Sequence, residues 1–222
     1  MGVFVGTNGP DRLIGTNGDD EIFGRGGDDT LNGRGGNDRL LGETGDDLLF
    51  GGQGTNDYDG GPGFDALTYE RSAGPVRVDL GEGVAFNADG DEEELISIEA
   101  VGGSEFDDSL FGSNNDDILV GEGGADIIVG QDGSDILRGN DGMDRLFGER
   151  GNDDVRGNKG ADFIEGNAGI DTLFGGNGND TMDGGDRGDL LIGGKGKDSM
   201  TGGGGRHAQR RQRCRHPGRR RR

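Results

Sequence analysis

Aspartate recurs at every ninth position along most of this sequence, and regularly spaced carboxylates are candidate metal ligands. In nine-residue units counted from Gly6 and again from Gly103, position six is Asp in seventeen of eighteen units, with Asn56 as the exception. Carboxylate oxygens are the donors that hard cations such as Ca²⁺ and Mg²⁺ prefer. The candidate metal ligands are Asp11, Asp20, Asp29, Asp38, Asp47, Asp65, Asp108, Asp117, Asp126, Asp135, Asp144, Asp153, Asp162, Asp171, Asp180, Asp189 and Asp198.

The chemistry of these aspartates depends on how the units stack. If two units make one coil, residues eighteen apart form a column along one edge, at the strand spacing of about 4.8 Å. Carboxylates at that spacing repel one another, so the columns require a counter-charge. Ca²⁺ accepts six to eight oxygen ligands in flexible geometry, whereas Mg²⁺ needs a stricter octahedron. Zinc prefers His or Cys, which residues 1–205 lack. The sequence therefore predicts several Ca²⁺ sites.

The two series of units define the expected columns. In the first series, one column runs from Asp11 to Asp65 and the other from Asp20 to Asn56. The second series repeats this arrangement, and we expect Asn56 to weaken the site that it shares with Asp38. Columns also have ends, where a missing neighbour should leave an aspartate without an ion. These end residues are Asp11, Asp20, Asp65, Asp108 and Asp198.

The remaining positions of each unit predict the elements that hold the aspartates. Position one is Gly in all eighteen units and position four is Gly in fifteen, which allows a sharp turn every nine residues. Position eight is always apolar or Tyr, so positions seven to nine predict a minimal strand with one inward side chain. One such side chain per unit cannot offset a backbone entropy cost of roughly 1–2 kcal/mol per residue. The fold class is therefore an all-β parallel solenoid that needs its ions.

Two units show the pattern most fully: GRGGDDTLN (24–32) and GGNGNDTMD (175–183). They resemble the Gly-Gly-x-Gly-x-Asp-x-apolar-x repeats of the RTX (hemolysin-type calcium-binding) family. The resemblance implies a parallel β-roll, in which each Ca²⁺ takes position-six aspartates of two stacked repeats and backbone carbonyls of glycine turns. It covers about 160 of the 222 residues.

The chain divides by pattern into four segments. Residues 1–68 and 103–205 are two β-roll blocks, and residues 69–102 form a β-rich insert without the nine-residue period. Val76, Val78 and Leu80 alternate as in a strand, and Ile96, Ile98 and Val101 suggest another. RTX proteins often carry a similar insert, beginning near Leu67-Thr68-Tyr69 and containing 78–81. We interpret it as a packed cap between two rolls; the alternative is a ligand-contacting loop.

The fourth segment, residues 206–222, is a tail with nine Arg and no acid. One interpretation is a disordered basic arm for nucleic acid or an acidic partner. A shift of reading frame offers another, because Gly and Asp codons preceded by a C are then read as Arg. We favour this second interpretation, in which the tail is repeat sequence read out of frame. Resequencing of the coding DNA tests it.

Composition limits the function classes. The chain has 53 Gly, 28% hydrophobic residues and a net charge of −21, which excludes an ordinary close-packed core. No apolar run is long enough to span a bilayer, and we expect no signal peptide at Met1–Val5. The single cysteine, Cys214, offers no disulfide framework. An acidic body repels phosphate backbones, so we do not expect nucleic acid as a partner.

The leading functional hypothesis is a calcium-binding module of a secreted bacterial protein, folding in extracellular Ca²⁺ and not catalytic by itself. The first alternative is the accessory part of an RTX metalloprotease, lipase or polysaccharide epimerase. Neither His-Glu-x-x-His nor Gly-x-Ser-x-Gly occurs, so a catalytic domain would lie outside this chain. The second is an adhesin-type solenoid. RTX proteins usually carry a C-terminal secretion signal, which this sequence does not reveal.

Position nine predicts an outward surface with apolar side chains. Phe111, Val129 and Phe147 are eighteen residues apart and should stack, and Phe23, Leu41 and Phe50 should offer a similar surface in the first block. Exposed apolar stripes suggest docking onto a neighbouring domain or protomer. The alternative is a shallow apolar surface that is tolerated without a partner.

Overall fold

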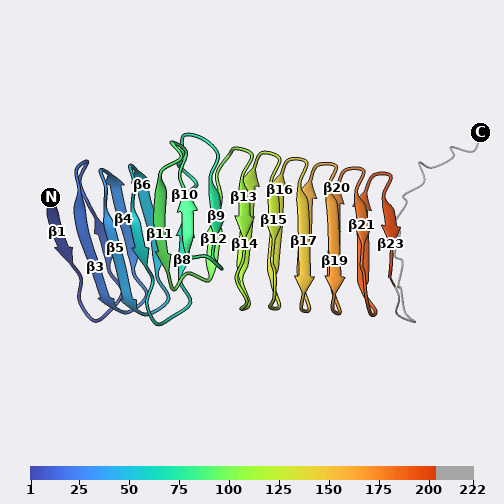
Figure 1. Cartoon of the computed structure of the whole chain (residues 1–222), viewed down its shortest axis with the longest axis horizontal. Helices are drawn as coiled ribbons and strands as arrows, with labels where there is room; N and C mark the ends of the chain where they lie inside the picture. The colour runs from blue at the N-terminus through green and yellow to red at the C-terminus, as the bar shows by residue number, and fades with distance from the viewer. Residues whose placement is uncertain (204–222) are drawn as a thin grey trace, which may run out of the picture.

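The structure is a computed structural model, and it describes residues 1–203. These residues form an elongated solenoid of short strands, with the N-terminus at one end and β23 at the other (Figure 1). They contain no helix, and so none long and apolar enough to cross a membrane. The predicted all-β parallel solenoid is confirmed. The prediction for the tail, residues 206–222, lies outside the described residues.

Within the repeat blocks, successive strands alternate between two sheets, so each sheet contains every second nonapeptide. The longer sheet has 13 strands. In spatial order they are β1 (Gly2–Val5), β3 (Asp20–Gly26), β5 (Arg39–Thr44), β7 (Asp57–Asp59), β11 (Glu92–Ile96), β10 (Val84–Phe86), β9 (Arg77–Asp79), β13 (Ser109–Phe111), β15 (Ile127–Val129), β17 (Arg145–Arg150), β19 (Phe163–Ala168), β21 (Thr181–Asp183) and β23 (Ser199–Thr201).

The shorter sheet has 10 strands. In spatial order they are β2 (Arg12–Ile14), β4 (Thr30–Gly35), β6 (Leu48–Gln53), β8 (Ala66–Thr68), β12 (Ala100–Gly102), β14 (Ile118–Gly123), β16 (Ile136–Asp141), β18 (Asp154–Lys159), β20 (Thr172–Asn177) and β22 (Leu190–Lys195). Within the repeats the pairing is parallel and joins residues eighteen apart, as Leu31 with Leu49. Two nonapeptides therefore make one coil.

The core is a double row of position-eight side chains between the sheets. Leu31, Leu49, Leu119 and Leu146 are each 0% exposed. Only Leu13 and Met200, in the coils at the two ends, remain partly open. In most units position nine is half-buried on the outer faces, as expected for strands whose side chains alternate.

The outward stripe predicted in the second block is present, because Phe111, Val129 and Phe147 are register partners in the longer sheet. In the first block the prediction was wrong for Phe50. Phe23 and Leu41 pair in the longer sheet, but Phe50 pairs with Asn32 in the shorter sheet, on the opposite face. A spacing of nine residues changes the sheet, and only a spacing of eighteen keeps it.

The insert continues both sheets. In the shorter sheet β12 lies between β8 and β14, parallel to both. In the longer sheet β11, β10 and β9 lie between β7 and β13, with β10 antiparallel to its neighbours. Ile96 and Val101, which the sequence suggested were part of one strand, belong to β11 and β12 with a turn between them.

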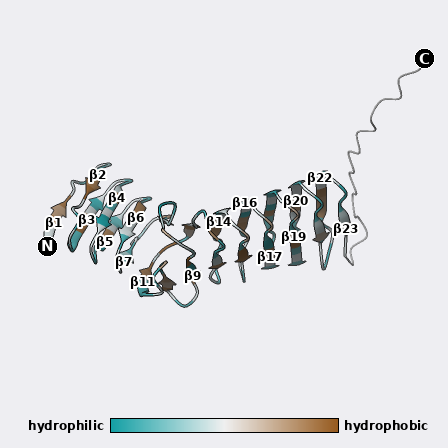
Figure 2. Ribbon diagram, turned by 90° about the horizontal axis from the view of Figure 1, so that it is seen from above, coloured by the Kyte–Doolittle hydropathy of each residue, from teal (hydrophilic) through white to brown (hydrophobic). Residues whose placement is uncertain are grey.

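This arrangement places two more strands in the longer sheet than in the shorter one between the repeat blocks. Each strand adds about 4.8 Å along the solenoid axis, so the longer sheet acts as a wedge of about 10 Å. The axis changes direction at β9–β11, seen most clearly from above (Figure 2).

Candidate metal centre

The position-six aspartates lie immediately before the strands and beneath the turns. Fifteen of the seventeen are buried, with at most 3% of the residue exposed, and Asp11 and Asp198 in the end coils are half-buried. Stacked coil upon coil, these side chains form two buried columns, one at each edge of the solenoid. Carboxylates are rarely buried without a partner, so each column needs partners for its charges.

We name each column by the sheet whose strands it precedes. The short-sheet column contains Asp11, Asp29, Asp47, Asp65, Glu99, Asp117, Asp135, Asp153, Asp171 and Asp189. The long-sheet column contains Asp20, Asp38, Asn56 and Glu93 in one stretch and Asp108, Asp126, Asp144, Asp162, Asp180 and Asp198 in the other.

One carboxylate oxygen of each aspartate is used within the protein. Within each repeat block, the backbone N–H of a column aspartate donates to Oδ1 of the column member in the next coil. Examples are Asp29 to Asp47 at 2.8 Å and Asp126 to Asp144 at 3.0 Å. These bonds fix the side chain against the adjacent coil and satisfy a backbone donor that the turn leaves free.

The other oxygen, Oδ2, has no such partner in most coils. Among the described residues, twelve buried Oδ2 atoms accept no hydrogen bond, and they belong to Asp29, Asp38, Asp47, Asp65, Asp126, Asp135, Asp144, Asp153, Asp162, Asp171, Asp180 and Asp189. A buried carboxylate oxygen without a donor is strongly unfavourable unless a cation compensates it. The pattern is therefore one whose donor atoms fit a cation.

Backbone oxygens converge on the same place. A Cβ on Gly24, at position one, would collide with Oδ2 of Asp29 and lie 2.6 Å from the carbonyl oxygen of Gly42 in the next coil. Glycine is thus required because two oxygens occupy that space. Among residues 1–203 no cluster of three or more His, Cys, Asp or Glu side chains could hold a metal ion. The donor set combines aspartates with turn carbonyls, which suits Ca²⁺.

The turns are of two kinds, a distinction that sequence reasoning missed. In most units the position-two residue has a positive φ, such as 71° at Asn140 and 80° at Arg25. Four units have Thr or Ser at position two, and there the position-two N–H bonds to the aspartate Oδ2: Thr7 to Asp11, Thr16 to Asp20, Ser104 to Asp108 and Ser113 to Asp117. The presence of Thr or Ser at position two was the sequence signal that could have predicted these capped turns.

The Thr-capped turns differ in their electrostatics from the other turns. In the Thr-capped turns, hydrogen bonds from Thr7 and Thr16 lower the pKa values of Asp11 and Asp20. In positive-φ turns, burial raises the pKa of Asp144 to about 6 and that of Asp162 to about 7. Nearby negative charges, such as Asp180 beside Asp162, add to the rise. Burial also raises the pKa values of Asp108 and Asp117 in the Ser-capped turns, so it is the Thr-capped turns of Asp11 and Asp20 that favour a bare charge.

Two glutamates of the insert occupy column positions, and the sequence analysis missed both. The N–H of Asp65 donates to Oε2 of Glu99 at 2.8 Å, and the N–H of Asn56 donates to Oε1 of Glu93 at 3.0 Å. Asp65 is therefore not at a column end, contrary to expectation, because strand pairing brings a residue 34 positions away into register. The nine-residue period carries no signal for either glutamate.

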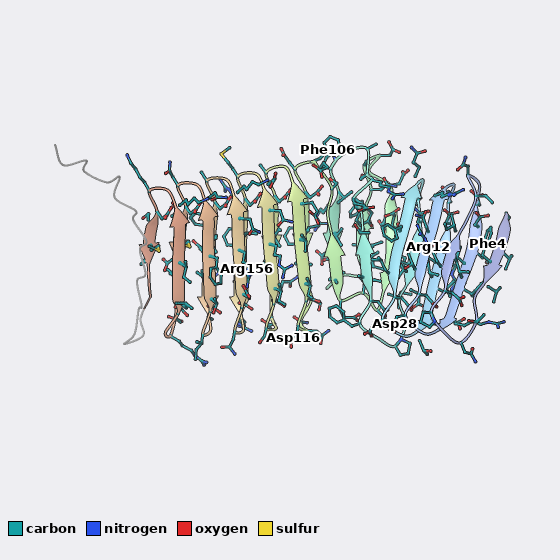
Figure 3. All side chains as sticks on the ribbon, turned by 180° about the vertical axis from the view of Figure 1, so that it is seen from behind. Phe4, Arg12, Asp28, Phe106, Asp116 and Arg156 are labelled. Carbon is teal, nitrogen blue, oxygen red and sulfur yellow. The ribbon has the colours of Figure 1, made fainter. Side chains whose placement is uncertain are left out.

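The turns also carry polar ladders outside the buried columns. Position-five side chains accept backbone N–H groups of the next coil, as Asp28 from Asp46 at 3.1 Å and Asp116 from Ser134 at 2.6 Å. Both aspartates lie at the turns along one edge (Figure 3).

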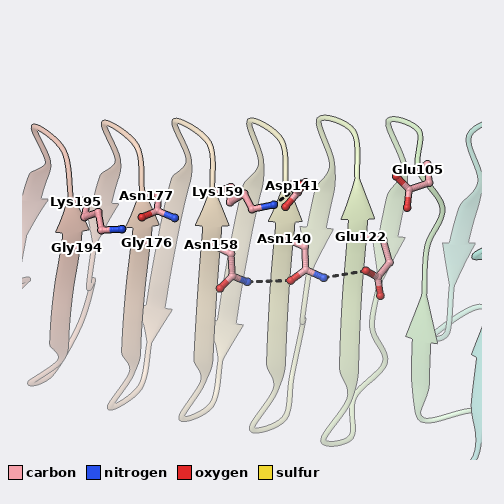
Figure 4. Close-up of a pocket in the computed structure, with 10 residues that line it drawn as sticks. All are labelled: Glu105, Glu122, Asn140, Asp141, Asn158, Lys159, Gly176, Asn177, Gly194 and Lys195. Carbon is pink, nitrogen blue, oxygen red and sulfur yellow. Dashed lines mark hydrogen bonds and ion pairs between the residues drawn. The ribbon is translucent and has the colours of Figure 1, made fainter.

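On the edge that carries the long-sheet column, a groove of about 700 Å³ follows the turns. The Asn158 amide donates to Asn140, and the Asn140 amide donates to Glu122 (Figure 4). These contacts tie the coils together without using the buried aspartates.

Comparison with known proteins agrees with the geometry. A search of curated proteins found no match. A family model described as "RTX calcium-binding nonapeptide repeat (4 copies)" matches seven times, at residues 5–40, 32–67, 102–137, 129–164, 138–173, 156–186 and 174–206. The matches leave out most of the insert and cover well over half of the chain. The chain therefore belongs to the family of RTX calcium-binding nonapeptide-repeat proteins.

Proposed function

We propose that this chain is a calcium-operated β-roll, a module of a secreted protein that folds as it binds Ca²⁺ along both columns. The observation that carries the proposal is the set of twelve buried Oδ2 atoms without a donor, in a chain of net charge −21. Divalent cations would supply the missing partner and reduce the repulsion between stacked carboxylates.

The proposed ligands are the position-six aspartates of the positive-φ turns, together with carbonyl oxygens of the glycine turns. Each ion would lie between two successive coils at one edge, because Oδ2 of one coil and a position-one carbonyl of the next share that space. The Thr- and Ser-capped turns are weaker candidates, since Oδ2 of Asp11, Asp20, Asp108 and Asp117 already accepts a hydrogen bond.

Calcium concentration would act as the switch. Extracellular modules typically bind Ca²⁺ with dissociation constants of about 10⁻⁴–10⁻³ M, far above cytosolic levels. The chain would then stay unfolded in the cytosol and fold after export, with binding free energy becoming folding free energy. Proteins of this repeat family are typically secreted, which supports the proposed location. We propose that the module itself is not catalytic.

Far-UV circular dichroism of the whole chain, titrated with Ca²⁺ and separately with Mg²⁺, tests this function. We expect a cooperative transition from coil to β structure with Ca²⁺ and little change with Mg²⁺. Full β structure in excess chelator would overturn calcium-driven folding, and a chain that binds no Ca²⁺ by equilibrium dialysis would overturn the whole proposal.

A further inference from the structure

The short-sheet column crosses the insert without losing its register. Ala66, Ala100 and Ile118 are successive partners in β8, β12 and β14. The residue before each of them is Asp65, Glu99 and Asp117. The carbonyl of Asp65 accepts the N–H of Ala100, and that of Glu99 accepts the N–H of Ile118, both at 3.0 Å. Glu99 thus has the backbone position of a column aspartate.

Its side chain also takes the place of a column carboxylate. The N–H of Asp65 donates to Oε2 of Glu99 at 2.8 Å, as the N–H of Asp47 donates to Oδ1 of Asp65 at 2.8 Å. The turn before Glu99 is short, and the carbonyl oxygen of Ser97 packs over Gly60 as that of Gly42 packs over Gly24. A Glu side chain is one methylene longer than Asp, so it can reach the column from this shorter turn.

Unpartnered buried oxygens lie on both sides of Glu99. Asp65 is 0% exposed and its Oδ2 has no donor. Asp117 is 1% exposed, and its Oδ1 has no donor because the N–H of Glu99 bonds to the Asp65 carbonyl instead. Elsewhere in the column Oδ1 always faces the preceding coil, so this atom faces the coil of Glu99. Two buried anionic oxygens therefore flank a third carboxylate with no cationic group among their hydrogen-bond partners.

We propose that Glu99 is a calcium ligand, which forms a Ca²⁺ site at the junction together with Oδ2 of Asp65 and the Ser97 carbonyl. The proposal rests on calcium binding by the columns, and it makes the short-sheet column continuous from the first block to the second. Glu99 lies outside the repeats, so the nonapeptide pattern does not assign it.

Where the long-sheet column crosses the insert, the carboxylate oxygens already have hydrogen-bond donors. Glu93 is 1% exposed, and its oxygens already accept the hydroxyl of Tyr69 at 2.8 Å and the N–H of Asn56 at 3.0 Å. Its neighbour Asn56 is neutral, and on the other side of the insert the N–H of Val76 donates to Asp108. The polar atoms there are satisfied without an ion. Glu93 is therefore a matched control for Glu99, in the same insert and with the same side chain.

The test compares the whole chain carrying Glu99→Gln with the chain carrying Glu93→Gln, at saturating Ca²⁺. Native mass spectrometry counts the bound ions. We expect at least one ion fewer in E99Q and the wild-type number in E93Q. An unchanged count in E99Q would overturn the inference. If the wild-type chain itself bound no Ca²⁺, the proposed function would fail instead, so the two failures are distinguishable.

Hydrogen exchange distinguishes the loss of one local calcium site from misfolding of the whole variant. We expect E99Q to lose calcium-dependent protection in β8, β12 and β14 and to keep it in β18, β20 and β22. Loss of protection in those distant strands as well would contradict a single local site, and the inference would then be wrong.

Discussion

The two oxygens of a column aspartate have separate roles. Oδ1 accepts a backbone N–H of the neighbouring coil, whereas Oδ2 remains free beside a glycine carbonyl. A substitution that keeps the first role and removes the charge therefore isolates the second. Asn has the same shape as Asp and can still accept at one oxygen.

Asp144→Asn should weaken calcium binding. Interactions with a charged group contribute about 1.5–3 kcal/mol, so we expect about ten- to hundredfold weaker binding at that site. Isothermal titration calorimetry measures the effect. Asp141→Asn is the control, because Asp141 lies in the same turn and its exposed side chain is paired with Lys159. Equal effects of the two substitutions would show that overall charge matters and not the column.

The raised pKa values predict the behaviour of the chain without calcium. Burial raises the pKa of Asp38 and Asp171 to about 6 and of Asp126 and Asp135 to about 7. Because these folded-state values exceed the unfolded value near 3.9, proton binding favours the fold. This stabilisation is fully present below about pH 4 and is lost as the pH rises through 6 to 7.

We therefore expect the metal-free chain to gain β structure as the pH falls from 8 to 4, measured by circular dichroism in chelator. The same protons compete with the ion, so the calcium affinity should fall as the pH drops through 7 and 6. A metal-free chain whose spectrum does not change over this range would contradict the assignment of the buried aspartates as the source of instability.

At the scale of elements, the repeat sequence was sufficient to predict the strands and the columns of the two blocks. Each unit encodes its own turn and strand, and the eighteen-residue spacing follows from the coil. The insert was not predictable in this way. Glu93 and Glu99 reach their columns through pairing of β11 with β7 and of β12 with β8, which depends on residues far apart in the chain.

The capped turns support a separate prediction. Ser104 is 0% exposed, and its hydroxyl bonds to both oxygens of Asp108 at 2.9 and 3.0 Å. Ser104→Ala should lower the free energy of unfolding in calcium by about 1–3 kcal/mol, because it leaves a buried carboxylate poorly satisfied. The number of bound ions should not change. Chemical denaturation and native mass spectrometry measure the two quantities, with Ser109→Ala on the adjacent strand as control. A lost ion would mean that this turn binds metal.

At the scale of the whole molecule, calcium-driven folding should change the dimensions of the chain. Thirteen strands at about 4.8 Å make a rod of about 60 Å, with a radius of gyration near 20 Å. An unfolded chain of 222 residues has a radius of gyration of about 50 Å. Small-angle X-ray scattering should therefore record a fall of more than half when Ca²⁺ replaces chelator. A compact chain in chelator would show that the ions are not needed for assembly.

The wedge formed by β9 and β10 affects how the molecule can meet a partner. The apolar stripes that contain Phe23 and Leu41 in one block and Phe111, Val129 and Phe147 in the other belong to one sheet, yet the bend gives them different headings. A rigid planar surface laid against one stripe would diverge from the other. To bind both stripes at once, a partner must have a matching curvature, or two partners must bind. The insert therefore determines how many partners this face can hold.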